Sequence, residues 1–313
     1  MSRPAWIPVV GDVDATADGP TFRGEASEDG QAKAAIALTN QVFAGGVITV
    51  NVEFEDVSSN SVCDIVLWYD PSTRNMLTAG LGGGGWLSSV RFYNDVGITQ
   101  NKWTVHKGVG NSKSLQPKRT YKLEAALSGS RVAVIVDGVV TMMVDTQLNL
   151  PASQVGLFFL GTATCRTSEF QVAKTRGQAF VVMEFGGAYD ELYSDVIKPV
   201  CQTLDLDVHR ADETYGPGFI IGDIAASIQN AKLIIAEITP QNANVFFEVG
   251  YAYAIRKPTI LLAVEGTQLP FDVSPFRTLF YENTIGGRKK VEEGLRQHVN
   301  AALQTGQNLG TPP

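Results

Sequence analysis

The hydrophobic pattern of this 313-residue chain changes its period near residue 174, and this change constrains the fold more than any other feature. Up to about residue 173, apolar and polar residues alternate in short segments separated by Gly, Asp, Asn and Ser. From residue 179 onward, apolar runs of strand length alternate with segments of helical period. A chain of this length also exceeds the usual size of a single hydrophobic core. We therefore expect two domains, residues 1–174 and residues 175–313, with the boundary in the segment 174–178.

The alternating segments of the first half predict an all-β domain. Val, Ile and aromatic residues are frequent in residues 47–57, 64–70, 121–127, 131–138, 139–145 and 154–161. Asp137-Gly138, between two of these runs, is a strong hairpin signal because it accepts the positive φ angles of a tight turn. Short strands at regular spacing are typical of an antiparallel sandwich. Residues 80–85, GLGGGG, have the form G-x-G-x-x-G without a strand–helix unit around them, so we expect a hairpin tip or bulge.

The second half predicts a parallel, doubly wound sheet, because strands and helices alternate along it. The expected strands are residues 179–185, 207–211, 232–238, 258–264 and 278–282. The expected helices are residues 189–204, 222–231, 244–256 and 288–304, followed by a frayed tail, residues 305–313.

Charge and composition exclude several classes of function. The chain has a net charge of −7, with 14 basic and 16 acidic residues up to residue 174 and 11 basic and 16 acidic residues after it. Neither half has the basic excess that nucleic-acid binding needs. The first 15 residues lack the apolar core of a secretory signal, and no apolar run is long enough to span a bilayer. We expect a soluble cytoplasmic protein.

The cysteines and histidines do not suggest a disulfide framework or a metal site. Cys63, Cys165 and Cys201 lie far apart without C-x-x-C spacing, which fits a reducing compartment. The three histidines, His106, His209 and His298, are equally scattered, so we expect no metal.

Glu248 is the strongest candidate for chemistry. It stands among apolar and small residues in the segment 242–262, just after an expected buried strand. A lone carboxylate there is costly to desolvate. With Asn242 or Asn244 as helix cap, the positive end of the helix would keep Glu248 ionised, as attack on a glycosidic carbon requires. A glutamate that only complements the helix dipole explains the residue equally well at this level.

Four segments of the second half resemble the superfamily that joins nucleoside 2-deoxyribosyltransferases and bacterial TIR-like domains. They are residues 180–200, 209–239, 242–262 and 270–281. The resemblance implies a flavodoxin-like, TIR-like fold with Glu248 as the catalytic carboxylate. It also implies that Asp223 lines the sugar or base pocket and that residues 209–213 face it. The chain departs from relatives at Glu237, where they often carry Asp, and at Glu184, where they often carry Pro.

Other candidates for substrate binding follow from position. Arg210 and Asp212 follow an expected strand, where Arg210 could pair with a phosphate or carboxylate, or simply form a surface ion pair. Asn242 and Asn244 could bind ribose hydroxyls, although one of them is explained by capping. Phe185 and Tyr189 flank a glycine turn, where an aromatic ring could stack on a base; Phe185 could equally belong to the core.

Residues 121–174 resemble the end of a concanavalin A-like, laminin-G-like jelly roll, including a closing strand with an inward Phe170. Such domains often bind carbohydrate through aromatic side chains. Candidates are Trp68, Tyr69, Trp86, Tyr93 and Trp103, although core packing explains any single one of them better. A sensing or assembly role is expected.

These resemblances together imply an NAD glycohydrolase that uses NAD as substrate and needs no cofactor. A recognition domain fused to a TIR-like domain is associated with bacterial stress or phage defence, and a homo-oligomer is expected. Two alternatives remain: a nucleoside or nucleotide deoxyribosyltransferase or N-glycosidase, and a non-enzymatic module that binds a nucleotide or a glycan.

Overall fold

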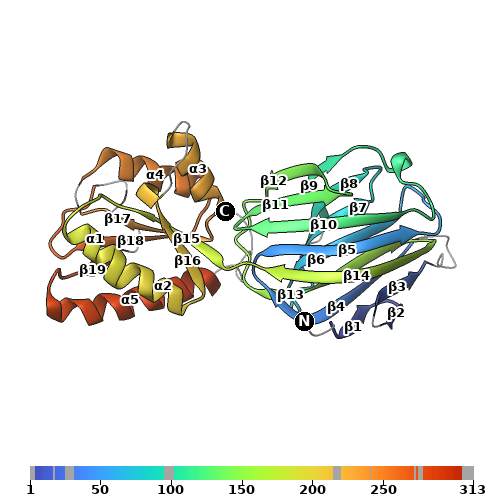
Figure 1. Cartoon of the computed structure of the whole chain (residues 1–313), viewed down its shortest axis with the longest axis horizontal. Helices are drawn as coiled ribbons and strands as arrows, with labels where there is room; N and C mark the ends of the chain where they lie inside the picture. The colour runs from blue at the N-terminus through green and yellow to red at the C-terminus, as the bar shows by residue number, and fades with distance from the viewer. Residues whose placement is uncertain are drawn as a thin grey trace. The chain divides into compact units, whose positions relative to one another are not determined.

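The computed structural model describes residues 4–16, 18–24, 32–94, 102–213, 220–239, 241–270, 273 and 278–304. The tail predicted to be frayed, residues 305–313, lies outside these ranges. The chain forms two compact units, and the main division along it falls between Thr175 and Arg176 (Figure 1). None of the helices in the described residues combines the length and the apolar character that a membrane-spanning helix needs.

The first unit contains two seven-stranded sheets with antiparallel pairing. One sheet has the order β1 (Trp6–Val10), β4 (Lys33–Phe43), β13 (Ser153–Gly161), β6 (Val62–Tyr69), β7 (Met76–Gly82), β8 (Ser88–Tyr93) and β9 (Trp103–Val109). The other has the order β12 (Val139–Asp145), β11 (Arg131–Val136), β10 (Thr120–Ser128), β5 (Gly46–Phe54), β14 (Thr164–Lys174), β3 (Gly19–Arg23) and β2 (Val13–Thr16). A short 3-10 turn, Ser112–Ser114, precedes β10.

Aromatic contacts join the two sheets into a sandwich. Phe22 of β3 stacks on Phe159 of β13 with ring centroids 5.6 Å apart, and Trp6 of β1 meets Phe170 of β14 edge-on at 4.8 Å. Along β5, every second residue is buried, as expected for a strand with one face on the core. The predicted antiparallel sandwich and the inward Phe170 are confirmed.

The turn residues act as their sequences predict. Asp137 and Gly138 have φ angles of 51° and 79° between β11 and β12, which confirms the hairpin. The glycines Gly82–Gly85 all have positive φ in the turn between β7 and β8, so the glycine-rich run is a hairpin tip.

The middle of the first sheet contains a buried ion pair that the sequence does not reveal. Asp64 of β6 is fully buried, and its Oδ2 accepts hydrogen bonds from Arg91 Nη2 of β8 at 2.6 Å and from Thr78 Oγ1 of β7 at 2.7 Å. Both β6 and β7 are buried along their whole length. A charge at this depth is tolerable because its partner comes from a nearby strand.

The second unit is a five-stranded parallel sheet with helices, as predicted. Its strand order is β16 (Leu206–Arg210), β15 (Gly177–Val182), β17 (Leu233–Glu237), β18 (Thr259–Val264) and β19 (Thr278–Tyr281). One apolar core joins one face of the sheet to α1 (Ala188–Leu192), α2 (Lys198–Thr203) and α5 (Ile285–Gln304). A second core joins the other face to α3 (Ile220–Asn230) and α4 (Ala243–Ala254) (Figure 1).

The helix predicted over residues 189–204 is interrupted. Between α1 and α2 the chain makes one turn of π-helix, Tyr193–Ile197. Pro199 stands in the first turn of α2. Proline has no N–H group and clashes with the carbonyl of the preceding turn, so the helical hydrogen bonds widen just before it.

The strand order reverses at β15, which lies between β16 and β17. At the carboxyl ends of the two inner strands, Val182 of β15 pairs with Ala236 of β17. In doubly wound sheets, ligands collect beyond the carboxyl ends of the strands at such a reversal. The side chains that follow Val182 and Ala236 are therefore candidates for a ligand-binding site.

Candidate functional site

Glu248 lies in the second turn of α4, on the stripe of the helix that faces the sheet. Asn242 caps the helix, its Oδ1 accepting a hydrogen bond from Asn244 N at 2.9 Å. The buried residues of α4 are Val245, Glu248, Val249 and Ala252, which recur at helical spacing on one side. The predicted helix is confirmed, and of the two candidate caps it is Asn242 that caps it, whereas Asn244 lies inside the first turn and is exposed.

Glu248 is a buried residue whose carboxyl group has no protein partner among the described residues. The residue is 9% exposed, and it makes no hydrogen bond or ion pair there. Burial raises the pKa of Glu248 to about 7. The helix dipole was expected to keep this group ionised, but its effect fades beyond the first turn, so desolvation decides. Near neutral pH, Glu248 therefore exists in both protonation states.

The position of α4 brings Glu248 toward the strand reversal. The helix contacts β15, β17 and β18, and its apolar residues share a core with Val182 and Ala236. α4 begins six residues after the carboxyl end of β17, so Glu248, in its second turn, lies on this face toward the carboxyl ends of the inner strands.

Glu237 is a second buried carboxylate at this edge, and it was not among the predicted site residues. It ends β17 with no exposed surface. Thr239 donates to it from its hydroxyl and from its backbone N–H, the latter at 3.2 Å from each carboxylate oxygen. Tyr281 Oη, at the end of β19, donates to Oε1 at 3.2 Å. In the sequence, the signal for Glu237 was an acidic residue at the end of an otherwise apolar strand.

Glu184 and Tyr189 lie beside Glu237. Glu184 follows β15 and is half-buried. Its negative charge raises the pKa of Glu237, although burial of Glu237 is the larger cause. Burial, followed by the charges of Glu237 and Glu184, raises the pKa of Tyr189 as well. Two carboxylates and two tyrosine hydroxyls thus gather at the carboxyl ends of β15, β17 and β19.

Arg210 is committed to partners within the protein. Its Nε and Nη2 bind Asp212 at 2.7 and 2.6 Å, and its Nη1 binds Asp190 at 2.7 Å. Its guanidinium also lies over the rings of Phe185 and Tyr193, at 5.2 and 4.6 Å from their centroids. The hydrogen bonds to Asp212 and Asp190 raise the pKa of Arg210. Three predicted site residues, Arg210, Asp212 and Phe185, are therefore in contact. Their cluster anchors the start of α1 through Asp190.

Two of the predicted residues, Asp223 and Phe185, are exposed. Asp223 is exposed in the first turn of α3. Phe185, 53% exposed, precedes the two glycines Gly186 and Gly187, whose positive φ angles turn the chain into α1. Part of the second segment of the family resemblance, residues 214–219, lies outside the described residues.

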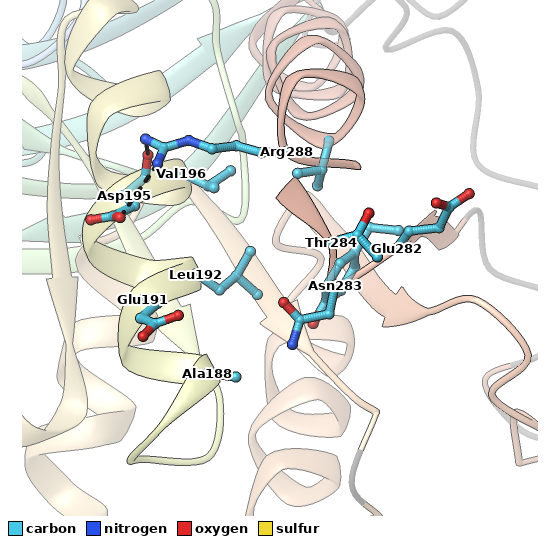
Figure 2. Close-up of a pocket in the computed structure, with 11 residues that line it drawn as sticks. Ala188, Glu191, Leu192, Asp195, Val196, Glu282, Asn283, Thr284 and Arg288 are labelled. Atoms are coloured by element: carbon cyan, nitrogen blue, oxygen red, sulfur yellow. Dashed lines mark hydrogen bonds and ion pairs between the residues drawn. The ribbon is translucent and has the colours of Figure 1, made fainter. Parts of the chain in front are cut away.

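A pocket of about 330 Å³ opens beside Tyr281, on the side of the sheet that carries α1 and α5 (Figure 2). Its floor is apolar, with Leu192, Val196 and Val291 among its residues. Arg288 on its wall is held by Asp195, whose backbone oxygen accepts from Nη2 at 2.8 Å. None of the predicted site residues lines this pocket, and Glu248 belongs to the opposite face.

Most aromatic candidates of the first unit belong to packed clusters. Trp68 stacks on Phe92 at 6.3 Å, and Tyr69 is buried. Trp103 lies 5.0 Å from Tyr93 and 5.1 Å from Phe158. Trp86 differs, being 39% exposed beside the glycine hairpin tip. Within the described part of the chain, no group of three or more His, Cys, Asp or Glu residues is arranged to hold a metal ion.

Comparison with known proteins finds solved structures that are similar to part of this chain, but no protein that is similar in sequence. No protein-family profile matches this chain, and no curated protein does. A carbohydrate-binding module, CBM66 from Bacillus subtilis, matches 53% of this chain and 92% of its own, with 14% identity and a TM-score of 0.42. The Caenorhabditis elegans galectin LEC-6 covers 49% of this chain and 96% of its own, with 16% identity and a TM-score of 0.32. For a Bacillus licheniformis β-glucanase the coverages are 54% of this chain and 91% of its own, with 10% identity and a TM-score of 0.34. At these identities and TM-scores, the matches assign no function to this chain.

Proposed function

We propose that the second unit is a TIR-like, flavodoxin-like domain that cleaves the nicotinamide–ribose bond of NAD, with Glu248 as the catalytic carboxylate. The observation that carries the proposal is that Glu248, a residue only 9% exposed, has no protein partner for its carboxyl group among the described residues and lies on a helix that contacts β15, β17 and β18. The strand order β16-β15-β17-β18-β19 is the order of flavodoxin-like sheets, which supports the assignment.

Glu248 is suited to glycosidic chemistry by its setting. In the ionised state its carboxylate attacks C1′ of the ribose, and the bond from C1′ to the nicotinamide nitrogen breaks. The electron pair of that bond passes to the ring nitrogen, so nicotinamide leaves as a neutral molecule. Water then attacks C1′, the bond to Glu248 breaks, and the proton of the water passes to solvent. The products are nicotinamide and ADP-ribose.

The positive charge of the nicotinamide ring favours the reactive form of Glu248. A cation within a few ångströms lowers the pKa of a carboxyl group, and a site of low polarity strengthens that effect. A pKa of about 7 in the free protein is therefore compatible with an ionised Glu248 in the complex. Binding of the substrate itself would complete the ionisation.

The first unit is a sandwich of two antiparallel sheets, and we propose that it is a concanavalin A-like jelly roll that senses a ligand, such as a glycan, or assembles the protein. Trp86 supports a ligand role because it is 39% exposed, whereas Trp68 and Tyr69 are buried and the half-buried Tyr93 and Trp103 contact each other. In this proposal the whole chain is an oligomeric effector that depletes NAD in bacterial stress or phage defence. Titrating the chain and its Trp86→Ala variant on a glycan array tests the ligand role.

The activity test is release of nicotinamide from NAD by the purified full-length chain, compared with Glu248→Gln. The proposal expects turnover by the unaltered chain and loss of at least about 100-fold in the variant, because the nucleophile is removed. Base exchange on deoxynucleosides without loss of NAD would instead identify a deoxyribosyltransferase. Saturable binding of NAD without any product from either chain would identify a binding module.

A further inference from the structure

Glu184 occupies the position at which the strand order reverses. β15 lies between β16 and β17, and the chain leaves its carboxyl end through Met183 and Glu184. Val182, the last residue of β15, belongs to the core on the α4 side of the sheet, as Phe180 does. Met183 belongs to the core on the other face, so the alternation continues past the end of β15 and Glu184 follows in the row of Phe180 and Val182. Glu184 and Glu248 therefore belong to the same side of the sheet.

The carboxylate of Glu184 is available to a ligand. The residue is half-buried, and within the ranges that the structure describes it makes neither a hydrogen bond nor an ion pair. The neighbouring carboxylate of Glu237 differs, since Thr239 and Tyr281 already donate to it. Of the two carboxylates at this edge, Glu184 is the one with unused acceptor capacity.

A pair of hydroxyl groups is the partner that fits this carboxylate. An ionised carboxylate only accepts hydrogen bonds, and its two oxygens match two adjacent hydroxyls. Acidic residues bind ribose hydroxyls in this way in other doubly wound folds. A phosphate is unsuitable, because Glu184 and Glu237 would both repel it.

We infer that Glu184 binds the 2′- and 3′-hydroxyls of the ribose that carries the leaving base, and that it selects ribonucleotides over 2′-deoxy analogues. The inference rests on the proposed function for the identity of the ligand. Glu248 would face C1′ of the same sugar from α4, while Glu184 fixes the ring from the end of β15. A hydrogen bond to a charged group accounts for about 10- to 100-fold in affinity.

Binding measured by calorimetry in the Glu248→Gln background tests the inference without turnover. The ligands are NAD and its analogue that lacks the 2′-hydroxyl on the nicotinamide ribose. Adding Glu184→Gln is expected to lower the affinity for NAD about 10- to 100-fold, and to lower the affinity for the analogue, which keeps only the 3′-hydroxyl, by a smaller factor of about 3- to 10-fold. Glu184→Asp, which keeps the charge, is expected to retain part of the preference for NAD. Glu191→Gln, an exposed acidic residue of α1, is the matched control and should change neither affinity.

Equal loss for both ligands, no loss for either, or no saturable binding of NAD would overturn the role of Glu184. Thermal unfolding of each variant checks that the chain remains folded, which a half-exposed Glu-to-Gln change should permit. The proposed function fails separately: NAD would bind with the preference for the 2′-hydroxyl, but the unaltered chain would release no nicotinamide. If Glu184→Gln cleaves NAD and keeps the preference for NAD over the analogue, the role of Glu184 is wrong and the proposed function still stands.

Discussion

The hydroxyl of Tyr281 donates a 3.2 Å hydrogen bond to the carboxylate of Glu237 across the end of an intervening strand. Tyr281 ends β19 and Glu237 ends β17, and β18 lies between these two strands. Thr239 completes the link, because its hydroxyl accepts a hydrogen bond from Val264 N of β18 at 2.8 Å. The carboxyl ends of three strands are thus tied together next to the candidate site.

Tyr281→Phe should loosen this edge. The change removes one hydrogen bond to a buried carboxylate and leaves Thr239 in place, so the local stability should fall by about 1–3 kcal/mol. Native-state hydrogen exchange of the amides of β17 and β19 measures the loss locally. Tyr189→Phe is the control, since the Tyr189 hydroxyl makes no hydrogen bond in the described residues. Equal exchange in both variants would show that the Tyr281 bond contributes nothing.

Glu248→Gln should stabilise the protein above neutral pH. The folded state holds the proton of Glu248 with a pKa of about 7, against an ordinary value of 4.5 for a glutamate in water. The folded state therefore binds more protons than the unfolded state between these values, and stability falls as the pH rises through them. The penalty is fully present above pH 7 and reaches up to about 3 kcal/mol. Calorimetric melting should show Glu248→Gln above the unaltered chain at pH 8 and level with it at pH 4.

The rate of NAD cleavage should increase with pH. Because attack needs the carboxylate, kcat/KM should rise about tenfold per pH unit below 7 and level off above it, reporting the free protein. The kcat profile should reach its plateau at lower pH, since the nicotinamide charge lowers the pKa of Glu248 in the complex. A rate that decreases as the pH passes 7 would mean that Glu248 acts as a proton donor.

Asp64→Asn should destabilise the sandwich far more than Asp14→Asn. Asp64 is fully buried, and its loss would leave the Arg91 charge buried without a counter-ion, at a cost of about 3–5 kcal/mol. Asp14 pairs with Arg23 at the same distance, 2.6 Å, but both side chains are more than half exposed. Such pairs contribute less than about 1 kcal/mol. Hydrogen exchange of the β6 and β8 amides measures the loss of stability in each variant. Similar losses in Asp64→Asn and Asp14→Asn would contradict a stabilising role of the buried pair.

The sequence predicted the strands that have one buried face, and the turns and caps that depend on a few neighbouring residues. Strands such as β5 and β10 have one buried face, so their alternation is visible in the sequence. The turn at Asp137-Gly138 and the cap at Asn242 depend on a few neighbouring residues and were also predicted. β7 and β8 were not predicted: β7 is buried on both faces, and β8 carries a charged Arg91 whose partner lies on another strand.

The candidate site was predicted in part for the same reason. Glu248 is recognisable because a carboxylate in an apolar helix contrasts with its neighbours. The grouping of Glu184, Glu237 and Tyr281 depends on the order of the strands in the sheet, which places residues 97 positions apart at one edge. Arg210 was predicted as a ligand contact, but its partner Asp190 comes from 20 residues earlier in the chain, so local sequence could not reveal the pairing.

Nicotinamide release from NAD, measured for the 313-residue chain and for Glu248→Gln, decides whether Glu248 is the catalytic carboxylate. Both chains should be assayed at pH 8, where the unaltered Glu248 is ionised, and at protein concentrations that span any self-association. We predict steady turnover by the unaltered chain and a rate lower by at least about 100-fold in the variant. Equal rates in the two chains, at every concentration, would contradict it.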